Sequence, residues 1–388
     1  MIKVKKIDIL KFLLYIFIMI PFFEMNALNY LSNLYGKIIN IWVLFSFLII
    51  LLLFLKQNRF SKYYIILFIF YLLLTISTFI NSGDIKSCLS IIIKSLSLCF
   101  LFDYGIKNDK DIFLKTVEYL LFILIFLNLC SILIFPSGLY IDTAGYTQNW
   151  LLGYKNTHIM YIFPFLLVTL LRNYMEKDKI SIKSIIFICV SVFSTIIINN
   201  STALIGLIII IILMIFKNKI LTSNFFSLKN YFITYICLFI SIVILKLQNI
   251  FSFIIVDLLK KDLTFTGRTY IWNSVIELIK KKPLLGYGNN IFVFNKHILS
   301  THNTILDILY KTGIFGMIPY LLLCLIIIKK VQFEKNKFSF IISTFLFSLF
   351  IMMLTEAYTI NFYFYVFIIA LNIKEFSNES RWKYENKK

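Results

Sequence analysis

The chain has 388 residues, of which 60% are hydrophobic, and its mean hydropathy is +0.87. Soluble domains contain about 45–50% apolar residues, so this composition excludes an ordinary soluble protein. The formal net charge is +20, but the basic residues lie scattered between apolar runs. Membrane topology explains that distribution better than a nucleic-acid partner does, and no nucleic acid is expected.

Twelve apolar runs are each long enough, at about 15–25 residues, to approach the thickness of a bilayer as helices. They predict an all-α polytopic membrane protein with a single membrane domain, residues 1–388, embedded in the lipid bilayer. The first run resembles the apolar part of a signal peptide, but the residues after it do not fit a cleavage site, so it is interpreted as a span. The runs are 8–23, 38–55, 63–80, 85–102, 113–135, 158–171, 182–198, 202–216, 230–250, 303–328, 338–354 and 358–373.

Basic residues alternate between the loops that these runs define. One set of loops, together with both chain ends, carries most of the lysines and arginines, whereas the short loops of the other set hold only Lys37, Lys86 and Lys155. Because short cytoplasmic loops are enriched in Lys and Arg, both termini are predicted to lie in the cytoplasm. The chain is therefore expected to be a multi-pass protein of the cell (plasma or inner) membrane.

The large loop 251–302 falls on the outer side and opposes this bias, because it is itself basic. Long loops are exempt from the rule, and two explanations stay open: a negatively charged ligand, or contact with anionic lipid headgroups. Apolar residues at helical spacing predict an amphipathic helix over Arg268–Lys282, lying in the membrane interface. Thr266 is the expected N-cap and Pro283 ends the helix.

Several residues of this loop suit an anionic ligand. Arg268 stands at the predicted start of the helix, where its guanidinium could grip a phosphate through two hydrogen bonds. Gly286 and Gly288 form a turn after Pro283, and glycine permits positive φ or a close backbone approach to a ligand. The alternative for Arg268 is contact with lipid headgroups.

His302 and Asn303 stand where the loop meets the tenth run. A histidine there could act as a general base near neutral pH, although lone histidines are more often structural. His158 and His297 lie elsewhere on the predicted outer side, and the three histidines lack metal-ligand spacing, so no metal is expected. The six cysteines lack CxxC spacing and are interpreted as small buried apolar residues without disulfides.

Few ionisable residues fall inside or beside the runs. Charges within a membrane are costly and are usually paired or functional. Asp307 and Lys311 are four residues apart on one helix and are expected to pair. Lys94 has no local partner and must find one on another helix or reach a cavity. Glu356, just before the last run, is a further candidate carboxylate.

The ordered elements resemble the O-antigen ligase/polymerase superfamily, which includes Wzy-type polysaccharide polymerases. The resemblance covers about residues 145–330. Its elements are Gly267-Arg268…Trp272, Pro283-Leu284-Leu285-Gly286-Tyr287-Gly288, His302-Asn303, Gly313-Ile314-Phe315-Gly316 and, upstream, Gly153-Tyr154-Lys155-Asn156.

The resemblance implies an inverting, metal-independent glycosyltransferase that needs no cofactor. Its substrate would be an undecaprenyl-pyrophosphate-linked glycan at the outer leaflet. Arg268 would clamp the pyrophosphate and His302 would act as base or orient the acceptor. Further substrate or pyrophosphate contacts would come from Lys155, Asn156, Lys282, Gly286, Gly288 and Asn303.

One departure concerns the segment Asn199–Thr202, where many members carry a Ser-Arg pair and this chain has no arginine. Lys155, Lys282 or Lys94 would have to supply the second cation. The first hypothesis is a polymerase of capsular or O-antigen-type repeat units, working beside flippase and chain-length regulator proteins. A ligase that transfers finished glycan, and a twelve-span flippase or transporter, remain alternatives.

Overall fold

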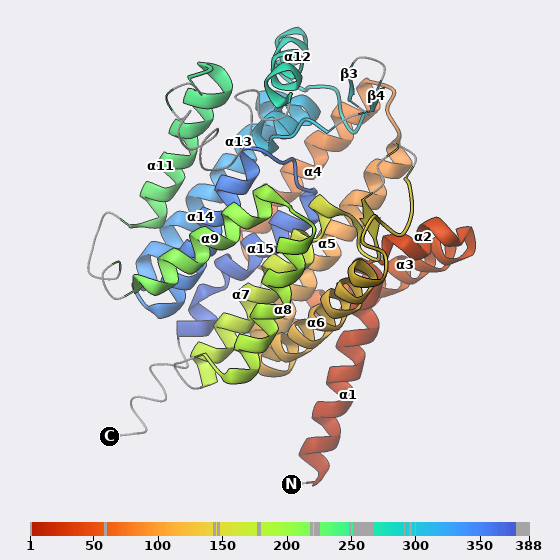
Figure 1. The fold of residues 1–388 in the computed structure, drawn as a ribbon, viewed down its shortest axis with the longest axis vertical. Helices are drawn as coiled ribbons and strands as arrows, with labels where there is room; N and C mark the ends of the chain where they lie inside the picture. The colour runs from red at the N-terminus through yellow and green to blue at the C-terminus, as the bar shows by residue number, and fades with distance from the viewer. Residues whose placement is uncertain are drawn as a thin grey trace.

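The computed structural model describes residues 2–57, 60–142, 145, 148–176, 180–217, 220, 226–247, 250, 267–290, 292–294, 297–298 and 300–377. Figure 1 shows helices packed side by side, with two short hairpins in the connections. The first half contains α1 (Ile2–Met19), η1 (Ile20–Phe22), α2 (Asn26–Leu31), α3 (Asn33–Lys56), α4 (Tyr63–Ile80), α5 (Ile85–Asn108), α6 (Lys110–Ile134), β1 (Asn149–Trp150), β2 (Gly153–Tyr154), η2 (Lys155–Thr157), α7 (Ile159–Glu176) and α8 (Ile182–Ile197). The second half contains α9 (Ser201–Ile215), α11 (Leu228–Leu238), the π-helix η3 (Phe239–Ile244), α12 (Arg268–Lys281), β3 (Val293–Phe294), β4 (His297–Ile298), α13 (Thr304–Glu334), α14 (Lys337–Met353) and α15 (Ile360–Leu371).

The predicted all-α class is confirmed, and each of the twelve predicted runs overlaps a helix. Among the described residues, six helices are long and apolar enough to cross a bilayer unaided: α3, α4, α5, α6, α13 and the segment that contains α7. The remaining apolar helices are shorter. One of these, α15, is buried along almost its whole length, so its neighbours surround it instead of lipid.

The start of α1 and helix α12 lie at opposite ends of the molecule (Figure 1). This arrangement agrees with the prediction that the N-terminus and the large loop face opposite sides of the membrane. The sidedness itself stays a prediction. Many large apolar side chains on α3 and α4 are exposed, as expected for helices that face lipid. Cys88, Cys99 and Cys324 are buried as predicted, but Cys189 and Cys237 are exposed, because their helix faces also point outward.

The long helix α13 is broken at Gly313, whose backbone is left-handed with φ 60° and ψ −162°. The turn at 283–288 fills this break. It replaces the hydrogen bonds that the interrupted helix cannot make, so the break carries no unsatisfied backbone groups at these positions. The bonds run from Tyr287 N to Tyr310 O (2.7 Å), Gly288 N to Lys311 O (2.8 Å), Ile314 N to Pro283 O (2.8 Å) and Phe315 N to Leu284 O (3.2 Å).

Candidate functional site

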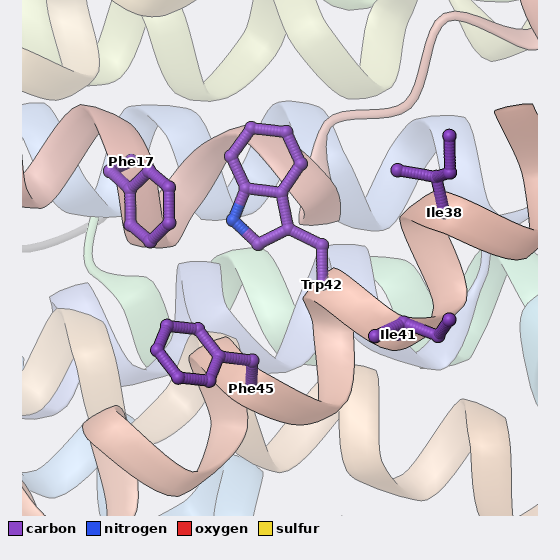
Figure 2. A pocket seen from close by; sticks show the side chains of 5 residues that line it. All are labelled: Phe17, Ile38, Ile41, Trp42 and Phe45. Atoms are coloured by element: carbon purple, nitrogen blue, oxygen red, sulfur yellow. The ribbon is translucent and has the colours of Figure 1, made fainter.

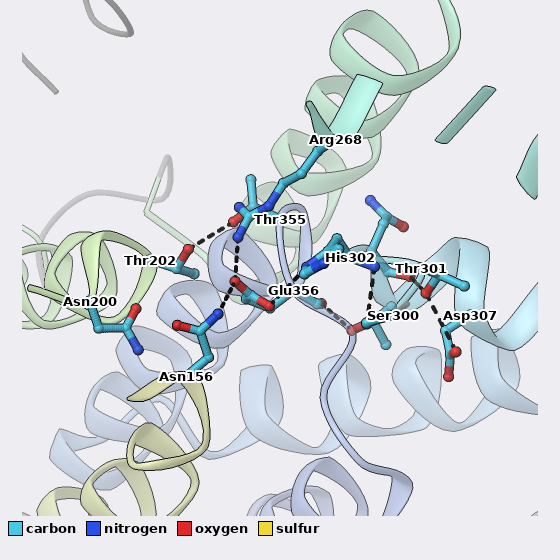
Figure 3. Close-up of polar contacts among 12 residues, drawn as sticks. Asn156, Asn200, Thr202, Arg268, Ser300, Thr301, His302, Asp307, Thr355 and Glu356 are labelled. Carbon is cyan, nitrogen blue, oxygen red and sulfur yellow. Dashed lines mark hydrogen bonds and ion pairs between the residues drawn. The ribbon is translucent and has the colours of Figure 1, made fainter. Parts of the chain in front are cut away.

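Glu356 lies at the centre of a polar cluster at the α12 end of the molecule (Figure 3). It stands in the connection between α14 and α15, and only 7% of the residue is exposed. Its backbone is fixed from both sides, because its N–H donates to Met352 O (3.1 Å) and its carbonyl accepts from the Thr304 hydroxyl (2.9 Å). A buried carboxylate held in this way needs polar partners of its own.

Three side chains from distant parts of the sequence supply those partners. Arg268 Nη2 lies 2.5 Å and Asn156 Nδ2 lies 3.1 Å from Glu356 Oε1. His302 Nδ1 lies 3.4 Å from the other oxygen, Oε2. The partners are 88, 200 and 54 residues away along the chain. The structure therefore brings together Arg268, Asn156 and His302, all of which the sequence nominated.

Helix α12 carries Arg268 as its first residue. The N-cap is Gly267, with φ 82° and no side-chain capping bond, which corrects the expectation of Thr266, a residue outside the described part of the chain. The helix buries Ile271, Trp272 and Val275. Trp272 is 1% exposed and donates from Nε1 to His302 O (3.3 Å), so this side chain packs on protein. Packing on the bundle thus ties Arg268 to the segment that carries His302.

His302 and Asn303 join the outer loop to α13. His302 has φ 48°, an unusual conformation for a residue other than glycine. Asn303 is fully buried and caps α13, since its Oδ1 accepts from Leu306 N (3.0 Å) while its Nδ2 donates to Leu354 O (2.9 Å). Asn303 therefore holds the Glu356 connection against α13. Its predicted substrate contact stays a prediction.

The segment that replaces the relatives' Ser-Arg pair also reaches this site (Figure 3). Asn200 caps α9 and donates to the carbonyl of Lys155 (3.1 Å), which fixes the turn that presents Asn156. Thr202 lies 3.3 Å from the hydroxyl of Thr355, the neighbour of Glu356. The position is polar but uncharged, and through Asn200 it contacts the backbone of Lys155. The resemblance had pointed to this segment only through its missing arginine, and it assigned no role to Asn200 or Thr202.

Lys282, Gly286 and Gly288 lie apart from the Glu356 cluster. The fourteen residues of α12 separate Lys282 from Arg268 by about 21 Å of helix. Lys282 donates to the side chain of Asn81 and lies 4.8 Å above the ring of Tyr287. The two glycines have positive φ, and an added Cβ would lie within 2.4 Å of backbone atoms of α13 or α4. Close packing thus accounts for these glycines, and ligand contact by them stays a prediction.

Four other ionisable candidates, Asp307, Lys311, Lys94 and His158, have protein partners. Asp307 and Lys311 pair as predicted, at 2.7 Å, and Lys94 pairs with Glu24 at 2.5 Å. His158 is buried between Asn128 and the carbonyl of Gly153. The side chain of His297 lies outside the described residues.

The arrangement suits chemistry on an anionic substrate. Arg268 and His302 side chains are 19% and 21% exposed, whereas that of Glu356 is 9% exposed, so both partners reach solvent while the carboxylate is enclosed. A guanidinium can bind phosphate and a neutral imidazole can accept a proton. Within the described part of the chain, no group of three or more His, Cys, Asp and Glu could hold a metal ion.

Comparison with known proteins agrees with the resemblance. Residues 185–321 match the family described as O-antigen ligase. This match covers about a third of the chain and supports the resemblance to the O-antigen ligase/polymerase superfamily. The matched range contains Asn200, Arg268 and His302, whereas Asn156 and Glu356 lie outside it.

A curated protein also matches a short stretch. The exopolysaccharide production protein ExoQ of Rhizobium meliloti (strain 1021) is 31% identical over 74 residues, which cover 15% of this chain and 17% of that protein. The chain thus spans only about a sixth of the length of this relative.

Proposed function

We propose that this protein is a membrane glycosyltransferase that polymerises undecaprenyl-pyrophosphate-linked repeat units into a capsular or O-antigen-type polysaccharide at the outer leaflet. The observation that carries the proposal is the convergence of Arg268, His302 and Asn156 on the buried Glu356. Two residues of this site, Arg268 and His302, lie in the range that matches the family, and together they combine a phosphate-binding cation with a proton acceptor.

The proposed reaction is an inverting displacement. An acceptor sugar hydroxyl attacks the anomeric carbon of the donor, the bond from that carbon to the pyrophosphate oxygen breaks, and the lipid pyrophosphate leaves with the electron pair. Arg268 stabilises the negative charge that develops on the leaving group. His302 takes the proton from the attacking hydroxyl. Neither step requires a metal or a cofactor.

A pyrophosphate carries more charge than Arg268 alone can neutralise, and Lys155 is the best second cation. It adjoins Asn156, which donates to Glu356, and its backbone carbonyl is held by Asn200. Lys282 lies at the far end of α12, and Lys94 pairs with Glu24. We therefore assign the role of the missing arginine to Lys155.

An apolar pocket of about 300 Å³ among α7, α8, α9 and α14 suits the lipid tail. The first of its α9 residues, Leu207, lies five residues, or about 8 Å, along the helix from Thr202. A second apolar pocket, of about 410 Å³, opens between α1 and α3 (Figure 2). Neither α1 nor α3 contributes to the Glu356 cluster, so the first pocket is the better candidate.

Polymerase is favoured over ligase by the Gly153-Tyr154-Lys155-Asn156 element, which resembles polymerases of this type, and by the absence of the Ser-Arg arginine. The printed name of ExoQ, an exopolysaccharide production protein, fits a polymer-forming role but does not separate the two reactions. A transporter is less favoured, because the charged side chains within the helices, Lys94 and Asp307, already have protein partners.

A gene-deletion strain distinguishes these functions through its lipid-linked glycans. Loss of a polymerase should leave single repeat units outside, loss of a ligase should leave long unattached chains, and loss of a transporter should trap single units inside. The single units can then be extracted and given to the purified protein in vesicles. Elongation of those units by wild-type protein would support the proposal, and their recovery unchanged would refute it.

A further inference from the structure

The two oxygens of Glu356 have different partners. Oε1 accepts from both Arg268 and Asn156, whereas Oε2 faces Nδ1 of His302. An ionised carboxylate can only accept hydrogen bonds, so the imidazole nitrogen that faces it must carry the hydrogen. In a neutral imidazole, the other nitrogen then holds the free lone pair.

We infer that Glu356 is the positioning residue of the site, and this inference rests on the proposed glycosyl transfer. Its Oε2 holds His302 in the form protonated at Nδ1, so that Nε2 is free to receive the proton of the attacking hydroxyl. Its Oε1 holds Arg268 at the same time. One carboxylate therefore positions both the proton acceptor, His302, and the cation that binds the leaving group, Arg268.

The proton balance supports this role. As the hydroxyl oxygen bonds to the anomeric carbon, its proton moves to Nε2 and His302 becomes a cation. That cation forms beside the Glu356 carboxylate, which stabilises it, as a carboxylate does in a Ser-His-Asp triad. The separation of 3.4 Å is long for a hydrogen bond, but catalytic contacts are often loose before substrate binds.

The other groups around the cluster leave this proton assignment intact. Trp272 Nε1 donates to the backbone carbonyl of His302 and not to its ring. Arg268 is the cation bonded to Glu356, and it lies on the opposite oxygen from His302.

Glu356→Gln is the decisive substitution, because glutamine keeps the shape but can turn an N–H towards His302. That donor would favour an unprotonated Nδ1 and place the hydrogen on Nε2, which removes the proton acceptor. Asp307→Asn is the matched control, since Asp307 is a similarly enclosed carboxylate at the same loop end that pairs with Lys311 instead. Glu356→Asp tests whether a shorter carboxylate restores function.

Two measurements follow. The first is the imidazole ¹⁵N spectrum of labelled full-length protein in bilayers, with His302→Gln used to assign one of the three histidines. We expect hydrogen at Nδ1 of His302 in the wild type and in Asp307→Asn, and at Nε2 in Glu356→Gln. This measurement needs no substrate, so it can fail while the proposed function stands.

The second measurement is the elongation rate with lipid-linked single units extracted from the deletion strain. We expect Glu356→Gln to lower kcat about 10²- to 10⁴-fold with a small change in KM, and Glu356→Asp to recover part of that loss. On a His302→Ala background, Glu356→Gln should lower kcat less than about threefold further, because the two residues act as one unit. A wild-type kcat in Glu356→Gln, or full additivity with His302→Ala, would overturn the inference. An inactive wild type would instead refute the proposed function.

Discussion

Two buried carboxylates, Glu356 and Asp103, lie beyond opposite ends of α15 and organise the molecule in different ways. Asp103 is fully buried in α5, and four side chains satisfy its two oxygens. The donors are Tyr63 (2.7 Å) and Asn372 (2.7 Å) on Oδ1, and Lys107 (2.7 Å) and Gln57 (3.2 Å) on Oδ2. The network joins the ends of α3, α4, α5 and α15.

The difference between the two centres is access to solvent. Lys107 has a side chain only 9% exposed and belongs to the same helix as Asp103. Arg268 and His302 are about twice as exposed and come from separate segments. A buried ion pair alone is thus weak evidence for a site. Partners that reach solvent and include a proton acceptor separate the Glu356 centre from a structural one.

Asp103→Ala gives the largest expected effect and tests the structural side of this comparison. Removing the carboxylate leaves Lys107 enclosed without its charge partner, which should lower the free energy of unfolding by about 3–5 kcal/mol. Denaturant titration of the purified protein in detergent measures this loss. The elongation rate per folded molecule should stay within about threefold of wild type. If the Asp103→Ala protein were stable but its kcat strongly reduced, Asp103 would take part in the reaction. The contrast between a structural carboxylate and a functional one would then be wrong.

Arg268→Ala tests the functional side. Loss of the guanidinium should lower kcat about 10²- to 10³-fold, or about 3–4 kcal/mol, because the leaving pyrophosphate loses its charge-assisted donor. Arg268→Lys should recover only part of the rate, since an ammonium lacks the planar fork. The matched control is Lys280→Ala, an exposed cation on the same helix that pairs only locally with Glu277. If Arg268→Ala left the kinetics unchanged, Arg268 would not be the residue that binds the pyrophosphate. If Lys94→Ala abolished function instead, a transporter would be favoured.

The sequence predicted the helices, and it drew attention to Arg268 and His302, for physical reasons. Long apolar runs predict membrane helices directly. Helix α4, for example, has the same bounds, 63–80, as its predicted run. Arg268 and His302 stood out because charge and imidazole are rare in such a composition. The order of the local motifs then indicated the resemblance to a family.

Glu356 was a candidate carboxylate from the sequence, but its place at the centre of the site could not be predicted. Glu356 contacts Asn156 across 200 residues, and no local pattern encodes that contact. Gly286 and Gly288 show a different limit, because a glycine pattern cannot reveal whether a ligand or protein backbone is the close neighbour. Thr266 gave a good capping pattern, yet Gly267 takes the N-cap position.

Gly288→Ala sharpens the distinction between packing and ligand binding. Its φ is 69°, and an added Cβ would lie 2.3 Å from Thr78 Cα, so the substitution combines backbone strain with a backbone clash. We expect the free energy of unfolding to fall by about 2–3 kcal/mol, of which the left-handed conformation accounts for about 1–2 kcal/mol. Gly145→Ala is the matched control, because Gly145 has φ 84° with nothing within 4 Å of the added atom. A stable Gly288→Ala protein with a raised KM would show that Gly288 meets the substrate instead.

The smallest expected effect compares Lys155 with Lys282, the two lysines that could supply the second cation. Lys155→Ala should raise KM for the lipid-linked donor about five- to tenfold, close to 1 kcal/mol, as expected for one charge near a partly solvated phosphate. Lys282→Ala should change KM less than about twofold, because Lys282 lies about 21 Å along α12 from Arg268. The KM values should be measured at low and high salt. Screening weakens an exposed contact, so the penalty of Lys155→Ala should shrink as ionic strength rises. A larger effect at Lys282 would mean that the pyrophosphate extends along α12, and the site would then include the turn that now only fills the break in α13.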